Sequence, residues 1–102
     1  MPKHQYDNAC QQRILNTMLA LFGHEIDGLS PSQIAQLTQS SASNVTRDLH
    51  NLEAVGVVER LAHNNNARIT PMLGQKALAI LGSLDRASQR IDDTKNRFTR
   101  TN

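Results

Sequence analysis

With 102 residues, the chain can form one domain around one small core. It has one tyrosine, two phenylalanines and no tryptophan, so this core must consist mostly of aliphatic side chains. This length excludes a roomy enzyme pocket, and the one cysteine, Cys10, excludes a disulfide framework and favours a reducing, cytoplasmic location. The net charge of +2, whose excess lies in residues 85–102, permits a nucleic acid partner without requiring one.

The first part of the chain predicts one helix after a short tail. Residues 1–8 are polar, and we expect them to be loose. Between residues 9 and 22, apolar side chains recur at spacings of three and four, which predicts an amphipathic helix. Asp7 or Asn8 can cap its start, and Gly23 can end it.

A connector and a second helix follow. Ile26 or Leu29 can form a short edge strand in the connector. Ser30 followed by Pro31 is a typical helix start, because serine caps the first turn and proline needs no hydrogen-bond partner there. We therefore predict a helix over residues 31–38, with these apolar side chains turned inward: Ile34, Ala35 and Leu37.

The next segment predicts a third helix and a hairpin. Ser41 can cap a helix over residues 42–55, and Gly56 can end it in the left-handed conformation. Residues 57–61 and 67–70 are typical of two strands, joined by an asparagine-rich turn that tolerates left-handed backbone. Helix, helix, turn, helix and hairpin in this order are the winged helix-turn-helix arrangement.

The last segment predicts a long helix that begins at Pro71 and extends to about Phe98. Its apolar residues follow a heptad pattern with Thr94 as the polar exception, and Gly82 lowers helix stability by about 1 kcal/mol relative to alanine. Two packings remain open, one on the first helix of the same chain and one against the same helix of a second copy. We expect the stretch from Leu73 to Leu84 to be covered within the chain and the remainder to form a homodimer. The expected dimer interface comprises Ile80, Leu84, Ala87, Ile91 and Phe98.

Together these elements predict a mainly α fold with a small β-hairpin. We expect a loose segment over residues 1–8, a three-helix winged helix-turn-helix domain over 9–72 and a terminal helix over 73–102 that serves dimerisation.

Residues 34–60 resemble the DNA-binding segment of IclR-type and MarR-type bacterial regulators. The resemblance extends over about residues 12–80, where Ile69-Thr70-Pro71 and Gly74 are similar to the family's entry to the next helix. It departs at Gln39 and Ser40, where these families usually have glycine and an apolar residue. The residues that carry it are Ile34, Ala35, Thr38, Ser41, Ser43, Val45, Arg47, Leu49, Leu52, Glu53, Gly56, Val58, Glu59 and Arg60.

The resemblance implies a small transcriptional regulator of bacterial or phage origin that binds double-stranded DNA in a sequence-specific way. With 100° per residue, Val45, Leu49 and Leu52 fall within about 60° of each other and can anchor the third helix. The opposite face carries Ser43, Arg47 and His50, and a helix of this width fits the major groove, where arginine can pair with guanine.

The candidate DNA-binding residues lie in three places. The recognition helix at residues 42–55 enters the major groove, the start of the second helix can meet a phosphate, and the wing at residues 61–68 can contact the backbone or the minor groove. Ser30 is better explained as a cap. The candidates are Ser41, Ser43, Asn44, Thr46, Arg47, His50, Asn51, Ser32, Gln33, His63, Asn65 and Arg68.

Other chemistry finds no support in the sequence. The four histidines are scattered, no metal-ligand spacing or catalytic motif occurs, and we expect no enzyme activity, cofactor, metal, membrane or small-molecule ligand. The alternative function is a winged helix that binds proteins within a replication, transposition or other nucleoprotein complex.

Overall fold

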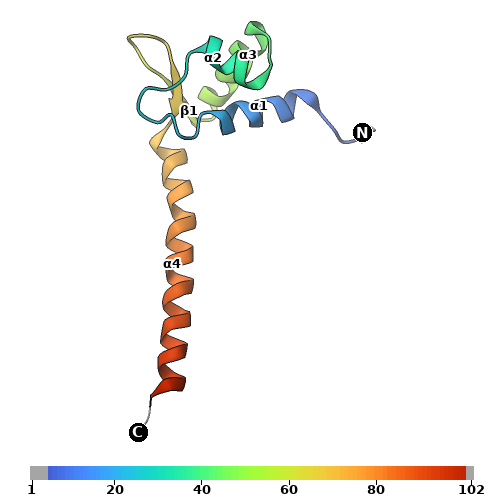
Figure 1. Ribbon diagram of the computed structural model, residues 1–102. Helices are drawn as coiled ribbons and strands as arrows, with labels where there is room; N and C mark the ends of the chain where they lie inside the picture. Colours follow the sequence, from blue (N-terminus) through green and yellow to red (C-terminus); the bar gives the residue numbers. More distant parts are fainter. Residues whose placement is uncertain (1–4, 101–102) are drawn as a thin grey trace. The chain divides into compact units, whose positions relative to one another are not determined.

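A computed structural model describes residues 5–100 of the chain, which form two compact units divided after Pro71. The first unit contains three helices, α1 (Ala9–Ala20), α2 (Pro31–Thr38) and α3 (Ala42–Ala54), and the strands β1 (Val58–Arg60) and β2 (Ala67–Ile69) (Figure 1). The second unit contains the long helix α4 (Pro71–Thr99), whose first residue belongs to the first unit. The predicted fold, a mainly α winged helix-turn-helix followed by a long helix, is confirmed. Residues 1–4 of the predicted loose segment and residues 101–102 of the predicted terminal helix lie outside the described residues.

Each helix of the first unit begins at a side chain that caps it. Asn8 Oδ1 accepts a hydrogen bond from Gln11 N at 3.0 Å, so Asn8 rather than Asp7 caps α1. Ser41 Oγ accepts from Asn44 N at 3.2 Å at the start of α3. These bonds satisfy backbone N–H groups that have no partner inside the helix, which fixes where each helix starts.

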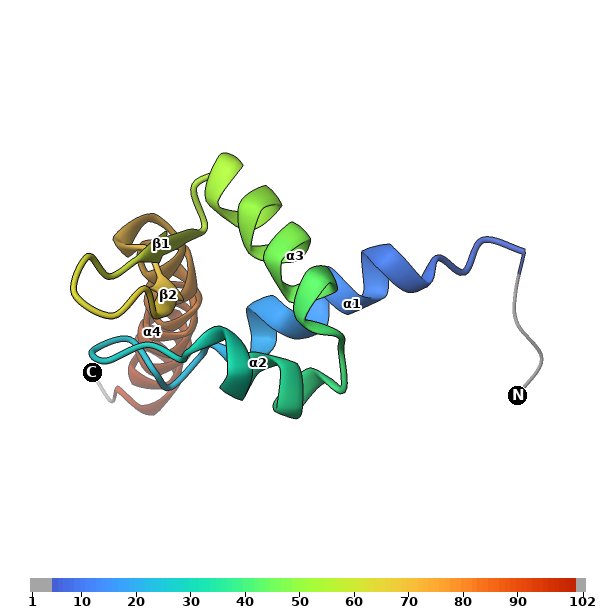
Figure 2. The ribbon, with the colours of Figure 1, turned by 90° about the horizontal axis from the view of Figure 1, so that it is seen from above.

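The core lies where the three helices meet (Figure 2) and continues to the hairpin, where Val58, Ala67 and Ile69 are also buried. Val45 and Leu49 of α3 are fully buried and Leu52 is 6% exposed, so the predicted apolar stripe anchors this helix. Leu21 and Ile34 are also fully buried. Burying a side chain of this size contributes roughly 1.5–3 kcal/mol, so these few residues account for much of the stability of so small a core.

The hairpin is connected to the start of the helix-turn-helix by one β-bridge. β1 and β2 are antiparallel, with Glu59 opposite Arg68. Leu29 pairs with Ala67 through two hydrogen bonds, Leu29 N to Ala67 O at 2.9 Å and Ala67 N to Leu29 O at 2.8 Å. Of the two residues predicted for an edge strand, Leu29 therefore forms the bridge, whereas Ile26 is 80% exposed. This bridge holds the wing against the connector that leads into α2.

The turn between α2 and α3 keeps its usual shape without a glycine. Gln39 has φ 52° and ψ 44°, the left-handed conformation that glycine favours. Ser40 N donates to Ala35 O at 3.0 Å and Gln39 N to Gln36 O at 3.4 Å, which is the Schellman pattern of a helix end. Thr38 Oγ1 donates to Ser40 Oγ at 2.9 Å, so Ser40 makes a polar contact within this turn.

One prediction about a buried face is wrong, and in α1 the spacing left the inward face open. Leu15 and Leu19 of α1 are 54% and 60% exposed, because the face that packs inward runs through Thr17, which is fully buried, and on to Leu21. In α2, Leu37 was expected inward but is 61% exposed, although it lies only about 60° around the helix from the buried Ile34. A dense apolar pattern does not by itself say which of its residues pack.

Element ends differ from the predictions by one or two residues. The first helix ends at Ala20 rather than at residue 22, because Leu21 N and Phe22 N donate to carbonyls three residues back and tighten the last turn. The third helix ends at Ala54 rather than 55, and Gly56 has the predicted left-handed backbone with φ 82°. The strands span residues 58–60 and 67–69 and are shorter than the predicted 57–61 and 67–70.

None of the described residues of α4 is buried. Leu73 and Ala77 are half-buried, but Ile80 and Leu84 are 63% and 60% exposed. That the stretch from Leu73 to Leu84 packs on the first helix of the same chain stays a prediction. Among the described residues, no helix is long and apolar enough to span a membrane.

Candidate nucleic-acid interface

The exposed face of α3 carries a group of hydrogen-bonding side chains. Ser43, Arg47 and His50 are exposed on the side opposite Val45 and Leu49, as the spacing predicts. Thr46 and Asn51 are also exposed, but both are partly engaged, because Thr46 Oγ1 donates to Ala42 O and Asn51 Nδ2 to Arg47 O. The face therefore combines a guanidinium with hydroxyl, imidazole and amide groups. The opposite face of the helix is packed into the core through Val45 and Leu49.

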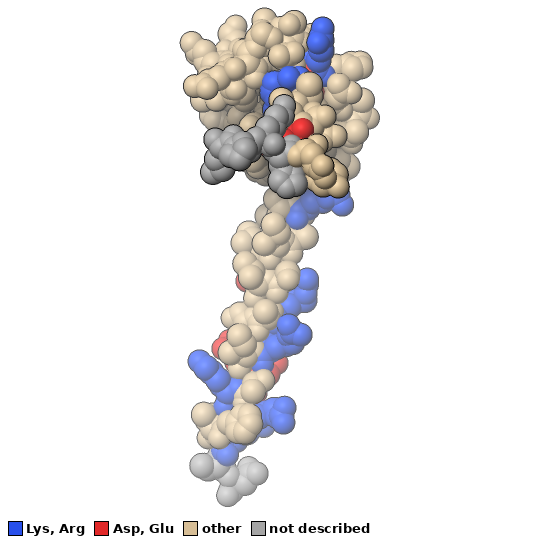
Figure 3. Space-filling view, turned by 90° about the vertical axis from the view of Figure 1, so that its right-hand side faces the viewer, with Lys and Arg blue, Asp and Glu red and all other residues tan. Residues whose placement is uncertain are grey.

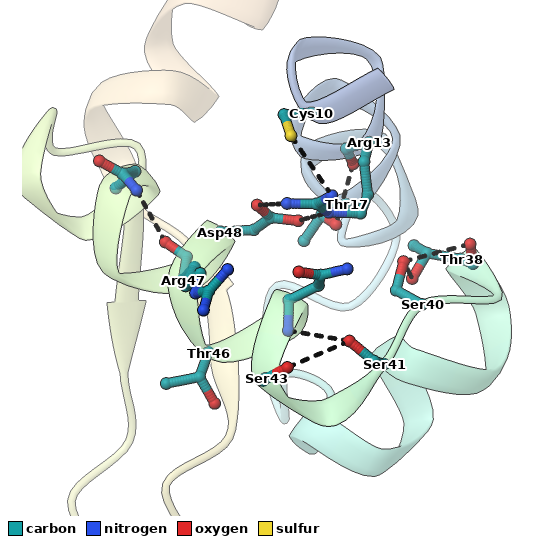
Figure 4. Close-up of polar contacts among 12 residues, drawn as sticks. Cys10, Arg13, Thr17, Thr38, Ser40, Ser41, Ser43, Thr46, Arg47 and Asp48 are labelled. Atoms are coloured by element: carbon teal, nitrogen blue, oxygen red, sulfur yellow. Dashed lines mark hydrogen bonds and ion pairs between the residues drawn. The ribbon is translucent and has the colours of Figure 1, made fainter. Parts of the chain in front are cut away.

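A partly buried ion pair holds α3 to α1. Arg13 Nε donates to Asp48 Oδ2 at 2.7 Å and Arg13 Nη2 to Asp48 Oδ1 at 3.0 Å, a two-pronged contact (Figure 4). Asp48 is 4% exposed, and the hydrogen bond from Arg13 to its carboxylate raises the pKa of Arg13 further above its ordinary value. Asp48 lies on the recognition helix, yet its charge is directed into the protein and neutralised there. Its charge therefore contributes little to the exposed face of α3.

Arg47 differs from the other arginines of the first unit. Arg60 lies 3.4 Å from Glu53 and Arg68 lies 2.9 Å from Glu59, and Arg13 is bound to Asp48. Among the described residues, no ion pair or side-chain hydrogen bond involves the Arg47 guanidinium, which Figure 4 shows apart from the Arg13 pair. A free guanidinium is available for a phosphate or a guanine without the loss of an existing contact.

The start of α2 is occupied mainly by its own cap. Ser30 Oγ accepts from Gln33 N at 3.2 Å and Gln33 Oε1 accepts from Ser30 N at 2.9 Å, which is a complete capping box. The capping role favoured for Ser30 is confirmed. Ser32 is exposed, and Gln33 keeps only its amide nitrogen for another partner, so phosphate contact by these two residues stays a prediction.

The wing offers polar groups rather than free cations. Asn65 has φ 62°, the left-handed backbone predicted for an asparagine in this turn, and His63 is exposed at the tip. Arg68 donates to Glu59 and, through Nη1, to Ile26 O at 3.1 Å. Arg60 Nε donates to Asn65 O at 2.9 Å. Both arginines therefore stabilise the hairpin, and their contact with DNA stays a prediction.

A shallow groove runs between α1 and the recognition helix. It is lined by Cys10, Gln11, Arg13 and Ile14 on one side and by Asn44, Arg47, Asp48 and Asn51 on the other. Arg13 Nη1 lies 3.8 Å from the exposed Cys10 Sγ. Sequence reasoning missed this contribution of α1, because Arg13 and Asp48 are 35 residues apart. The one available signal was the position of Asp48, beside the buried stripe of its helix. Among the described residues, no group of three or more histidine, cysteine, aspartate or glutamate side chains could hold a metal ion.

Comparison with known proteins supports the winged helix-turn-helix fold. Residues 24–70 match the model of the MarR family. The structure is similar to the crystal structure of MepR, a transcription regulator of the Staphylococcus aureus multidrug efflux pump MepA, with a TM-score of 0.55 and 24% identity over 81% of this chain. This chain spans 62% of that MepR chain. A MepR mutant from a multidrug-resistant S. aureus clinical isolate gives a TM-score of 0.54 and 24% identity over 97% of this chain and 82% of that one. No curated protein matches the chain.

Proposed function

We propose that this protein binds double-stranded DNA and regulates transcription, because residues 24–70 match the model of the MarR family, a family of transcription regulators that are not enzymes. In this proposal α3 enters the major groove and the wing follows the backbone or the minor groove. The observation that carries it is the exposed face of α3, with the free guanidinium of Arg47 at its centre.

The proposed contacts divide into two kinds. Arg47 and Asn44 present groups that can read base edges, since arginine pairs with guanine and asparagine with adenine. Ser43, Thr46 and the exposed capping residue Ser41 offer hydroxyls for phosphates or bases, while His50 and Asn51 lie further along the helix. Base contacts give sequence preference, and phosphate contacts fix the orientation of the protein on the duplex.

One copy of the first unit brings little positive charge to DNA. Its described arginines other than Arg47 are already paired with carboxylates, so few phosphates are neutralised and binding by a single copy should be weak at moderate salt. We propose a homodimer, which would present two recognition helices to a pseudo-palindromic site. Its interface would be the exposed apolar seam of α4, comprising Ile80, Leu84, Ala87, Ile91 and Phe98.

The test is a titration of fluorescent duplex DNA with protein over a series of salt concentrations. We expect affinity to fall steeply with the logarithm of the salt concentration, and Arg47→Ala to weaken the preferred duplex by roughly 5- to 150-fold and to reduce the salt slope by about one. Arg47→Lys is the matched control, because it keeps the charge but loses the two-pronged geometry.

The two variants separate charge from base recognition. If Arg47 reads a base, Arg47→Lys retains most of the salt slope but loses preference between duplexes. Absence of binding by the wild-type chain at low salt would refute the proposal and favour the protein-binding alternative. Far-UV circular dichroism confirms that each variant is folded before its affinity is compared.

A further inference from the structure

The charged residues that border the apolar seam of α4 are all positive. In a heptad labelled a to g, the seam occupies positions a and d, and positions e and g lie beside it. The charged residues at positions e and g are Lys76, Arg90, Lys95 and Arg97. The three carboxylates described in α4, Asp85, Asp92 and Asp93, lie at heptad positions further from the seam. In Figure 3, lysine and arginine side chains gather along the second half of this helix.

The second half of the seam forms a shallow apolar hollow between these cations. Ile91 and Phe98, which are 58% and 82% exposed, form its floor, and Arg90 and Lys95 line its edges. None of the ion pairs among the described residues involves a cation of α4. Asp93 accepts a hydrogen bond from Gln89 at 3.0 Å and lies away from the hollow. The cations at its edges therefore have no carboxylate partner in the described chain.

A second copy of α4 cannot supply the missing negative charge. In a parallel pair, the position of Arg90 faces that of Lys95 in the other copy, and in an antiparallel pair with the seam fully overlapped Lys76 faces Arg97. Every charged flanking residue has the same sign, so any two-helix pairing opposes a cation with a cation or with a neutral residue. Like charges at these positions weaken pairing, whereas opposite charges strengthen it and decide the choice of partner.

We propose that the seam of α4 is a docking surface for an amphipathic helix of another protein that carries acidic residues beside its apolar face. The proposal rests on the proposed role of α4 as the association element and adds a regulatory consequence to it. An acidic helix and a second copy compete for the same residues, so the acidic partner displaces the second copy. The two recognition helices are then no longer joined, and binding to a two-part DNA site is lost.

The experiment uses the full chain and two synthetic helices that differ only in the flanking charges. One peptide has the sequence of residues 71–100, and the other carries K76E, R90E, K95E and R97E in the same sequence. Glutamate, lysine and arginine have similar helix propensities, so the two peptides differ little in intrinsic helicity. Binding of each labelled peptide to the full chain is measured by fluorescence anisotropy at about 0.05 M and about 0.5 M salt, concentrations that screen charges to different extents.

We expect the glutamate peptide to bind the full chain roughly 10- to 100-fold more tightly than the unaltered peptide at low salt, and this difference to shrink at high salt. A full chain carrying R90E, K95E and R97E should reverse the preference. A full chain carrying I91D should lose affinity for both peptides, because a carboxylate replaces an apolar contact at the centre of the hollow. Arg47→Ala should bind both peptides as the wild type does.

Equal affinities, or tighter binding of the unaltered peptide, would overturn the proposal and identify a second copy as the occupant. Undiminished binding to the I91D chain would also overturn it, because the peptides would then bind elsewhere. No DNA is present in this assay, so its outcome is independent of whether Arg47 reads DNA. In sedimentation, the glutamate peptide should convert dimers of the full chain into one-to-one complexes.

Discussion

Replacement of Gly28 by alanine should loosen the attachment of the wing to the helix-turn-helix. Gly28 has φ +68°, and a Cβ at this position would lie 2.6 Å from Ala67 O, the carbonyl that accepts the hydrogen bond from Leu29 N. The left-handed backbone costs an alanine about 1–2 kcal/mol, and displacement of this carbonyl weakens a bridge of two hydrogen bonds worth about 1 kcal/mol each. We therefore expect Gly28→Ala to lower the free energy of unfolding by about 2–4 kcal/mol.

Gly23→Ala is the matched control. Gly23 also has a positive φ, +94°, but an added Cβ would meet no atom within 4 Å, so only the backbone cost of about 1–2 kcal/mol remains. Urea unfolding followed by circular dichroism gives both free energies, and amide exchange at Leu29 and Ala67 reports on the bridge. Equal losses in the two variants, or unchanged exchange in Gly28→Ala, would refute the argument that the close approach to Ala67 matters.

Three further predictions concern single residues. Gln39→Gly should raise the free energy of unfolding by about 1 kcal/mol in urea titrations, because Gln39 has a left-handed backbone, and no gain would show that its side chain compensates. Asp48→Asn should lower the melting temperature by roughly 5–10 °C in calorimetry by leaving Arg13 without its charged partner, whereas an unchanged transition would mean the pair adds nothing. Gly82→Ala should stabilise α4 by about 1 kcal/mol and increase its helical circular dichroism signal, since the added Cβ would meet only the movable Arg86 guanidinium at 3.3 Å.

Local signals predicted the elements well because the features that start and end a helix act over a few residues. Ser30 and Ser41 cap helices where expected, and Gly56 has the left-handed backbone that its position suggested. The stripe of Val45 and Leu49 is buried because α3 packs along a single face. Helix ends were less predictable, since the last turn of α1 tightens in a way that no residue type dictates.

Contacts between distant segments could not be predicted in the same way. Leu15 and Leu37 are as apolar as the core residues, and only the packing of the other helices shows that they remain exposed. The pairing of Arg13 with Asp48 depends on how α1 crosses α3. Arg68 shows the same limit, because its charge suggests DNA contact while the cross-strand position of Glu59 provides it with a partner. The exposed face of α3 was predictable because it follows from the spacing within one helix.

If α4 pairs with a second copy, as proposed, its lack of fully buried residues makes the amount of helix in this protein depend on the protein concentration. An isolated helix in water is held mainly by its own hydrogen bonds, and its stability is marginal when no face is packed. A segment of 29 residues with Gly82 in its interior should therefore fray in dilute solution and become ordered as it finds a partner. Dilution alone would then unfold α4, nearly a third of the chain, while the winged unit stays folded. The helix content of α4 would then report the concentration of the protein.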